Sequence, residues 1–346
     1  MSYNKILIIQ TAFPGDVVLT TPLIRAAKEN FQDAELCFLL IPDTQDLLKN
    51  NPFVKEVIVY EKKGKGGPGF WKTLRRVKEL EFDLALIPHR SFRSALLAKL
   101  AGCKRRVGFN ASAGRIFLTN QVIYRLDKHE IERNLSLLSF FGIEQRPSLP
   151  ELFPGPQEFS GVEKLLSKNG ASFSDELVCI APGSVWATKR WLPEGFARVA
   201  EKLIQEEKIK VILIGSAGDK ISADSIAGMM KIKPVNACGE FSLLESAALI
   251  SKARLVLSND SAPTHMAVAM RTPVVTIFGS TVPEFGFYPY GEGNGIIQKQ
   301  LYCRPCGIHG RNRCPEKHFR CMKEISAEEV FAILKQKLNE KRVQAG

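Results

Sequence analysis

The sequence has no long apolar run, so it lacks the mark of a membrane-spanning helix. None of its apolar stretches approaches the roughly 18 residues that such a span needs. The early apolar run at 6–9 is followed by Pro14 and Asp16 before it could serve as a signal peptide. With 45% hydrophobic and 24% charged residues among 346, the composition excludes disordered and fibrous proteins. We therefore expect a cytoplasmic protein large enough for two domains.

Acidic residues are absent from 84–126. The whole chain carries 48 Lys and Arg against 36 Asp and Glu, a net charge of +12. Two acid-free stretches hold much of this excess, at Lys62, Lys63, Lys65, Lys72, Arg75, Arg76, Arg90, Arg93, Lys99, Lys104, Arg105, Arg106, Arg115 and Arg125. The excess favours an anionic partner: a nucleic acid, an acidic lipid or a phosphorylated small molecule. We expect no nucleic acid partner, because these stretches lack an RNP, helix-turn-helix or interleaved aromatic pattern.

No secretory signal is recognised, so the eight cysteines are not expected to form a disulfide framework. Cys37, Cys103, Cys179 and Cys238 lie singly and are predicted to be small buried side chains. The other four begin with the C-x₂-C spacing of a structural zinc knuckle, although the second pair is spaced C-x₆-C: Cys303, Cys306, Cys314 and Cys321. A structural zinc, reduced thiols and a local disulfide stay open as alternatives for this cluster.

Short apolar runs alternate with amphipathic stretches along the chain. In the first half, strands are expected at 6–10, 36–41, 57–60 and 84–88, and helices near 23–31 and 70–80. A stretch with four prolines, 147–156, predicts a linker. After it, strands are expected at 177–181, 211–215, 234–237, 255–258 and 274–278, and helices near 193–205, 243–250 and 262–270.

This alternation predicts an α/β fold with two doubly wound parallel-sheet domains, at 1–152 and 157–325. Ligands bind at the carboxyl ends of the strands in such sheets, so the two domains are expected to face each other across a ligand cleft. A further amphipathic helix in 326–346 is expected to pack back on the N-terminal domain.

Three polar motifs follow predicted strands. After the strand at 6–10 comes Thr11-Ala-Phe-Pro-Gly-Asp16, whose carboxylate either takes a proton from an attacking hydroxyl or caps the next helix. After the strand at 177–181, the hydroxyls of Ser184 and Thr188 and the cation of Lys189 would suit a diphosphate. That loop has neither G-x-G-x-x-G nor P-loop spacing, which argues against a dinucleotide-dependent oxidoreductase and against an NTPase. Alternatively, Lys189 is an ordinary solvated charge.

The third motif, Ser258-Asn-Asp-Ser-Ala-Pro-Thr-His265, crosses a strand-to-helix junction. Free N–H groups at the start of the helix favour an anion near Asp260 and Ser261. His265 lies about one turn into the helix, where it either serves the site or is an ordinary buried histidine.

Together these motifs resemble glycosyltransferase family 9, the bacterial lipopolysaccharide heptosyltransferases. The matching residues are Pro14-Gly15-Asp16, Lys189-Arg190-Trp191, Asn259-Asp260-Ser261 through His265, Pro273-Val274 and Phe278-Gly279. The resemblance covers residue 4 to about 340. It implies the two-domain GT-B fold and an inverting, metal-independent transfer of heptose from ADP-heptose to the Kdo and lipid A inner core, like that of heptosyltransferase II.

The resemblance also implies roles for individual residues. Asp16 matches the general base that deprotonates the acceptor hydroxyl, and Lys189 matches the lysine that binds the ADP phosphates. The other residues implied at the donor are Ser184, Thr188, Asp219, Asp260, Ser261, Ala262 and His265. Ala262 departs from the family, which usually has glycine there. Lys62, Lys63, Arg90 and Arg93 are expected to bind the anionic Kdo-lipid A precursor at the inner membrane surface, where the protein would be peripheral.

Two other functions remain open at this point. A family 9 scaffold does not fix the sugar nucleotide or the acceptor, so another pair is the first alternative. A non-catalytic nucleotide-sugar-binding protein is the second, if Asp16 is only a helix cap that points away from the cleft.

Overall fold

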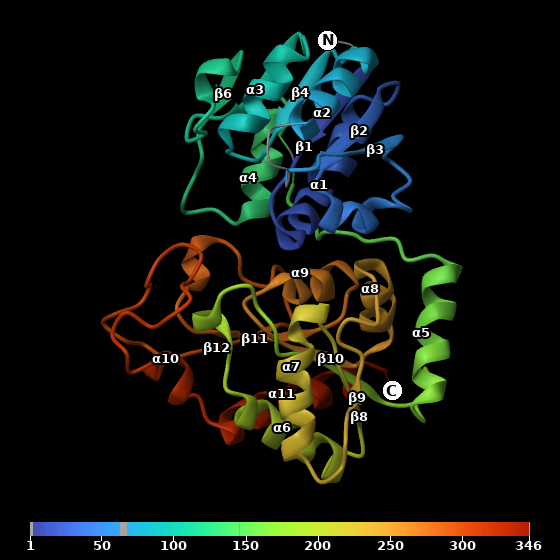
Figure 1. The fold of residues 1–346 in the computed structure, drawn as a ribbon, viewed down its shortest axis with the longest axis vertical. Coiled ribbons are helices and arrows are strands. Elements are labelled where there is room, and N and C mark those ends of the chain that lie inside the picture. The colour runs from blue at the N-terminus through green and yellow to red at the C-terminus, as the bar shows by residue number, and fades with distance from the viewer. Residues whose placement is uncertain (1–2, 63–67, 145, 346) are drawn as a thin grey trace. The chain divides into compact units, whose positions relative to one another are not determined.

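The computed structural model of the chain describes residues 3–62, 68–144 and 146–345, and the side chains of these ranges apart from 68 and 341–345. The chain forms two compact units, an N-terminal unit of Met1–Phe153 and a C-terminal unit of Pro154–Gly346 (Figure 1). The boundary lies inside the proline-rich stretch 147–156. Among the described residues, no helix has the length and apolar character needed to cross a membrane.

The N-terminal unit is built on a six-stranded parallel sheet in the order β3-β2-β1-β4-β5-β6 (Figure 1). Its strands are β1 (Lys5–Ile9), β2 (Glu35–Leu40), β3 (Glu56–Val59), β4 (Leu84–Ile87), β5 (Arg105–Phe109) and β6 (Asn120–Val122). Its α-helices are α1 (Pro14–Asn30), α2 (Pro68–Leu80), α3 (Phe92–Leu100) and α4 (Glu130–Ser136). Helix α1 packs against α4, and α2 against α3. The central strands are buried throughout β4 and nearly so in β1, as expected of a sheet covered on both faces.

Helix α1 begins at Pro14 and continues through Pro22, whereas the sequence pattern predicted a helix only from about 23. Pro22 has no N–H to give to the carbonyl of Val18, the usual partner one turn earlier. The hydroxyl of Thr21 donates to Val18 O instead, at 2.8 Å. The helix therefore tolerates Pro22 and extends back to Pro14, which places Asp16 in its first turn.

The C-terminal unit has a second six-stranded parallel sheet, in the order β12-β11-β10-β7-β8-β9. Its strands are β7 (Leu177–Ala181), β8 (Lys210–Leu213), β9 (Val235–Asn236), β10 (Leu255–Asn259), β11 (Val274–Phe278) and β12 (Gly295–Gln298). Its α-helices are α5 (Pro156–Lys168), α6 (Pro193–Gln205), α7 (Lys220–Met229), α8 (Leu243–Lys252), α9 (Ala262–Ala269), α10 (Arg320–Lys323) and α11 (Ala327–Ala345). The two doubly wound parallel sheets predicted from the alternating pattern are confirmed.

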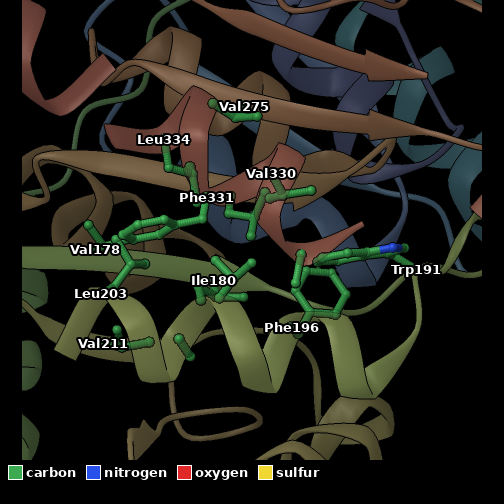
Figure 2. Close-up of a cluster of buried hydrophobic side chains, with 14 of the residues drawn as sticks. Val178, Ile180, Trp191, Phe196, Leu203, Val211, Val275, Val330, Phe331 and Leu334 are labelled. Carbon is green, nitrogen blue, oxygen red and sulfur yellow. The ribbon is translucent and has the colours of Figure 1, made fainter. Parts of the chain in front are cut away.

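Helix α11 packs on the C-terminal unit itself, and the expectation that it packs back on the N-terminal domain is corrected here. Figure 2 shows side chains of α6 and α11 meeting over Val178 and Ile180 of β7. Val330 and Leu334 of α11 are completely buried in this core, and α11 contacts α6, β10 and β12. The apolar face of the helix is therefore used within its own unit.

In each sheet the strand order reverses once, at a switch point where the connections from two neighbouring strands run toward opposite edges of the sheet. In the N-terminal unit this switch point lies between β1 and β4, and in the C-terminal unit between β7 and β10. In open α/β sheets, ligands usually bind at the carboxyl ends of the strands beside such a switch point. The three motifs found in the sequence all follow strands at these two switch points.

Candidate functional site

The switch point of the C-terminal unit is organised by Asn259, the last residue of β10. Its side chain is completely buried and accepts from Trp191 N at 2.9 Å while donating to Pro182 O at 2.8 Å. Asn259 therefore ties the start and the end of the loop after β7 to the end of β10. Sequence analysis did not name it as a site residue, although it stands inside the third motif.

Lys189 and Asp260 form an ion pair within this framework. The Lys189 Nζ lies 2.6 Å from Asp260 Oδ2, and the two side chains are only 14% and 8% exposed. The hydroxyl of Thr281 donates to the same Oδ2 at 2.6 Å. Low exposure strengthens such charge-assisted contacts, so the ammonium is held at the carboxyl edge of the sheet. The alternative that Lys189 is a solvated surface charge is wrong.

Thr188, next to Lys189, is buried and its hydroxyl is engaged within the protein. It donates to Ser280 Oγ at 2.9 Å and accepts from Arg311 N at 2.7 Å. The carbonyl of Ser184, earlier in the loop, accepts from Arg190 Nε at 2.7 Å. These contacts fix the loop on both sides of the Lys189 backbone.

Helix α9 begins two residues after Asp260, the acidic member of the ion pair. Ser261 is its N-cap residue, Ala262 its first residue, and His265 is buried within it. The hydroxyl of Ser261 donates to Asn259 O at 3.3 Å. Pro263 has no N–H and Thr264 N donates to Ser261 O at 3.1 Å, so the positive charge at this end of the helix comes from its aligned backbone dipoles. Lys189 and the start of α9 together offer positive charge to a phosphate group.

Asp219 lies after β8, on the other side of β7. Its Oδ2 accepts from Ser216 N at 2.9 Å and from Ser216 Oγ at 2.7 Å, which caps the short helical turn at Ala217–Asp219. The carboxyl packs directly on Gly183 of the β7 loop: a Cβ added to Gly183 would lie 2.2 Å from Asp219 Oδ1. One carboxylate oxygen is thus used for capping, while the group as a whole reaches the loop that carries Ser184.

Asp16 lies at the switch point of the N-terminal unit, in the first turn of α1. It is half-buried, and its Oδ2 accepts from Phe13 N at 3.1 Å, so the capping role weighed from the sequence is present. Burial, followed by the nearby charge of Glu130, raises the pKa of the Asp16 carboxyl to about 7, against the lowering effects of the Phe13 N–H and of Arg90. Such a carboxyl exchanges its proton near neutral pH.

Glu130 reaches this position because α4 packs on α1. Asn134, one turn further along α4, donates to Leu19 O at 3.1 Å and lies 3.5 Å from the hydroxyl of Thr20, one turn after Asp16. Glu130 is itself buried, where Tyr124 Oη donates to its Oε2 at 2.7 Å and Arg133 Nη1 lies 3.0 Å away. Sequence analysis missed this group, because nothing local to Glu130 reveals that α4 folds against α1.

Three of the four predicted acceptor residues also lie near this edge. The guanidinium of Arg90 sits 4.1 Å from the ring centroid of Tyr124, in a cation–π contact. The ammonium of Lys62 donates to the carbonyl oxygen of Thr11, and both burial and the nearby charge of Arg93 lower its pKa. Arg93 lies in the first turn of α3. Lys63 lies outside the described residues.

His89 follows β4 and was not among the predicted site residues. Its Nδ1 lies 2.8 Å from the Thr11 hydroxyl and 3.2 Å from the Ser94 hydroxyl. Burial, with the charges of Lys62 and Arg90, lowers the pKa of His89 to about 4, so the ring is neutral at pH 7. Basic residues and a neutral imidazole thus surround the β1–β4 switch point.

The cysteine cluster does not form the zinc knuckle that the spacing suggested. Residues 303–321 are all described, and within the described chain no three His, Cys, Asp or Glu side chains are arranged to hold a metal ion. The Sγ of Cys303 lies 3.8 Å from His318 Nε2, and the Cys306 thiol donates to the Cys303 carbonyl at 3.3 Å. Burial raises the pKa of Cys321 to about 11. None of the eight cysteines, all of which lie in the described ranges, forms a disulfide.

Comparison with known proteins bears on the whole chain. The sequence model of glycosyltransferase family 9 (heptosyltransferase) matches residues 70–318. Lipopolysaccharide heptosyltransferase 2 of Escherichia coli strain K12 is 29% identical over 297 residues, covering 81% of this chain and 84% of that protein.

Solved structures share the fold. The glycosyl transferase family 9 structure from Veillonella parvula superposes with a TM-score of 0.87 at 23% identity, covering 98% of both chains. The ADP-heptose lps heptosyltransferase II structure from E. coli gives a TM-score of 0.81 at 24% identity, covering 98% of this chain and 99% of that one. The fold is therefore of the GT-B type, with two Rossmann-like units.

Proposed function

Since the chain belongs to glycosyltransferase family 9, we propose that it transfers a heptose from ADP-heptose to the inner core of lipopolysaccharide, as an inverting, metal-independent enzyme like heptosyltransferase II. The observation that carries the proposal is the buried Lys189–Asp260 ion pair at the β7–β10 switch point. A fixed cation at this edge suits a nucleoside diphosphate, the leaving group of such a donor.

The donor binds to the C-terminal unit. Lys189 and the first turn of α9 neutralise the charge that develops on the ADP phosphates as the sugar leaves. Asp260 orients Lys189 and faces the donor sugar, and Asp219 binds the adenosine ribose through Oδ1, because Ser216 occupies Oδ2. The remaining donor contacts come from Ser184, Ser261, Ala262 and His265, while Thr188 supports the loop.

The acceptor binds to the N-terminal unit, with Asp16 as general base. The Asp16 carboxylate accepts the proton of the acceptor hydroxyl while that oxygen attacks the anomeric carbon. The bond from that carbon to the diphosphate oxygen breaks, and the leaving ADP takes its electron pair. Attack opposite the leaving group inverts the anomeric configuration. A pKa of about 7 suits this role, since a general base works best when its pKa is near the working pH.

Anionic groups of the acceptor bind Lys62, Arg90 and Arg93, together with Lys63 in the same basic stretch. A lipid-anchored acceptor would place the protein at the inner membrane surface as a peripheral enzyme. Asp16 belongs to the N-terminal unit and Lys189 to the C-terminal unit.

The proposal is tested by measuring ADP release from ADP-heptose with a panel of Kdo-lipid A acceptors, followed by mass spectrometry of the product. A product heavier by one heptose, with activity unchanged in EDTA, is expected. Release of nucleotide from a different sugar nucleotide alone would point to another family 9 reaction. ADP binding without transfer to any acceptor in the panel would favour a nucleotide-sugar-binding protein.

A further inference from the structure

The segment 299–319 lies between β12 and α10 and contains Cys303, Cys306 and Cys314. The reaction proposed above assigns it no role. We name it the cysteine segment. It makes a set of contacts with the loop that carries Lys189, and all of them lie within the C-terminal unit. We propose that the cysteine segment is a positioning element that holds Lys189 for the diphosphate of the donor. This inference rests on the proposed donor role of Lys189.

The first contact is a reciprocal pair of hydrogen bonds next to Lys189. Thr188 N donates to Arg311 O at 2.9 Å, and Arg311 N donates to Thr188 Oγ1 at 2.7 Å. The Thr188 hydroxyl in turn donates to Ser280 Oγ at 2.9 Å. Because Thr188 is 3% exposed, these bonds lie in a dry environment, where they fix the backbone from which Lys189 extends.

The second contact lies on the side chain of Lys189. Gly310 has a φ of +87°, and a Cβ added to it would lie 3.0 Å from Lys189 Cγ, 3.1 Å from Ser280 Oγ and 3.2 Å from Lys189 Cδ. The backbone of the cysteine segment thus covers the aliphatic stem of the lysine. A flexible four-carbon stem pressed in this way has fewer rotamers to sample, and its ammonium stays on Asp260.

The third set of contacts holds the partner of Lys189. Arg304 Nη2 donates to Thr281 O at 2.7 Å, and Cys306 N donates to Ser280 O at 2.9 Å. The hydroxyl of Thr281 is the one that donates to Asp260 Oδ2. The same segment therefore restrains both members of the ion pair, one through Gly310 and the other through Thr281.

The test is the substitution Gly310→Ala, with Gly293→Ala as the matched control. Gly293 has a similar φ of +82° but no atom within 4 Å of an added Cβ, so both variants place an alanine at a similar positive φ. Gly310→Ala pushes on the Lys189 stem, and we expect it to weaken ADP binding about tenfold and to lower kcat, with the acceptor KM unchanged. Gly293→Ala is expected to bind ADP as the wild type does. Binding is measured by calorimetry and folding by circular dichroism.

A double-mutant cycle separates positioning from a general structural effect. If Gly310 acts through Lys189, Gly310→Ala has no further effect on ADP affinity in the Lys189→Ala background. Arg304→Lys serves as a second variant should Gly310→Ala fail to fold. It keeps the positive charge but loses the hydrogen bond from the guanidinium to Thr281 O. We expect it to weaken ADP binding as well.

The possible failures are distinguishable. If Lys189→Ala leaves ADP affinity unchanged, the proposed donor site is overturned and this inference loses its premise. If Lys189→Ala weakens ADP binding while Gly310→Ala matches Gly293→Ala, the cysteine segment has no positioning role and the proposed function stands. Additive losses from Lys189→Ala and Gly310→Ala would also overturn the positioning role.

Discussion

The carboxyl group of Asp16 combines a structural and a chemical property. Its Oδ2 accepts from Phe13 N, and burial with the charge of Glu130 brings its pKa to about 7. A cap alone would favour a low pKa, because hydrogen bonds from N–H groups stabilise the carboxylate. The raised value shows that burial and the acidic neighbour outweigh the cap.

Asp16→Asn keeps an oxygen for the Phe13 N–H but cannot accept a proton. We expect kcat to fall by about 10²- to 10⁴-fold, the usual worth of a general base, with ADP affinity unchanged. The measurements are steady-state transfer and calorimetric ADP binding. Asp33→Asn, at an exposed aspartate of the same unit, is the control and should retain full activity. Normal transfer by Asp16→Asn would remove Asp16 from the mechanism.

The same substitution has an expected effect on stability. A carboxyl whose pKa is higher in the folded than in the unfolded state costs stability as pH rises from about 4 to about 7. Asp16→Asn removes that cost, so at pH 8 the free energy of unfolding of the variant should exceed that of the wild type. We expect a difference of about 1–2 kcal/mol, because solvent screens the charge of a half-buried group and keeps the effect small. At pH 4 the two should be alike. Urea unfolding at both pH values checks this, and an equal difference at both would contradict it.

Glu130→Gln tests the origin of the raised pKa. Removing the negative charge beside Asp16 should lower the pKa of Asp16, and the rise of kcat with pH should then occur at lower pH than the wild-type midpoint near 7. The pH–rate profile is the measurement. Glu132→Gln, on the same helix but ion-paired with Lys128, is the control. An unchanged midpoint in Glu130→Gln would show that burial alone sets the pKa.

At the scale of elements, the loop after β7 depends on a strand that follows it in the chain by about seventy residues. Trp191 N and Pro182 O both bond to the Asn259 side chain at the end of β10, and the Trp191 indole donates to Ile325 O at 3.2 Å. The position of Lys189 is thus fixed by residues that become neighbours only when the sheet forms.

Asn259→Ala should therefore destabilise the C-terminal unit. It leaves a buried N–H and a buried carbonyl without their partner, at an expected cost of about 2–4 kcal/mol. Chemical denaturation followed by tryptophan fluorescence measures this loss, since Trp191 lies beside the site. Asn169→Ala, an exposed asparagine at the end of α5, is the control and should change stability by less than about 0.5 kcal/mol. A loss of similar size in both variants would contradict the bridging role.

Several elements were outside the reach of sequence patterns for identifiable reasons. β5 opens with Arg105 and Arg106, and β6 contains Asn120 and Gln121, so neither looks like a buried strand. β5 pairs with the edge that β4 offers, and β6 then pairs with β5. α5 begins at Pro156, the last proline of the predicted linker, because proline is well suited to the first position of a helix. The short apolar runs of β1, β7 and β10 were predicted correctly, since burial on both faces leaves a continuous apolar signal.

At the scale of the whole molecule, the positive charge is concentrated in one unit. The acid-free stretches lie within 62–126, in the N-terminal unit that also holds Asp16. Arg93→Glu should raise the acceptor KM by about tenfold and leave ADP binding unchanged, because long-range charge acts mainly on the anionic ligand of that unit. Transfer kinetics at low and moderate salt measure the effect, which should shrink as salt rises.

Arg198→Glu is the matched control for net charge. Arg198 is exposed on α6 of the C-terminal unit, and the substitution changes the total charge by the same amount. If both variants raise the acceptor KM equally, acceptor binding responds to overall charge. The proposed acceptor-binding role of Lys62, Arg90 and Arg93 is then wrong.

The sequence by itself determined the α/β class, the two doubly wound units and the three motifs at the ends of β1, β7 and β10, because short-range periodicity and strand-end position are local properties. Tertiary structure alone decided the environment of those motifs. Glu130 raises the pKa of Asp16 from another helix, Asn259 fixes the loop that carries Lys189, and the cysteine segment packs on the lysine stem where a zinc site had been considered. These effects depend on distance and burial between residues far apart in the chain, which no local pattern encodes.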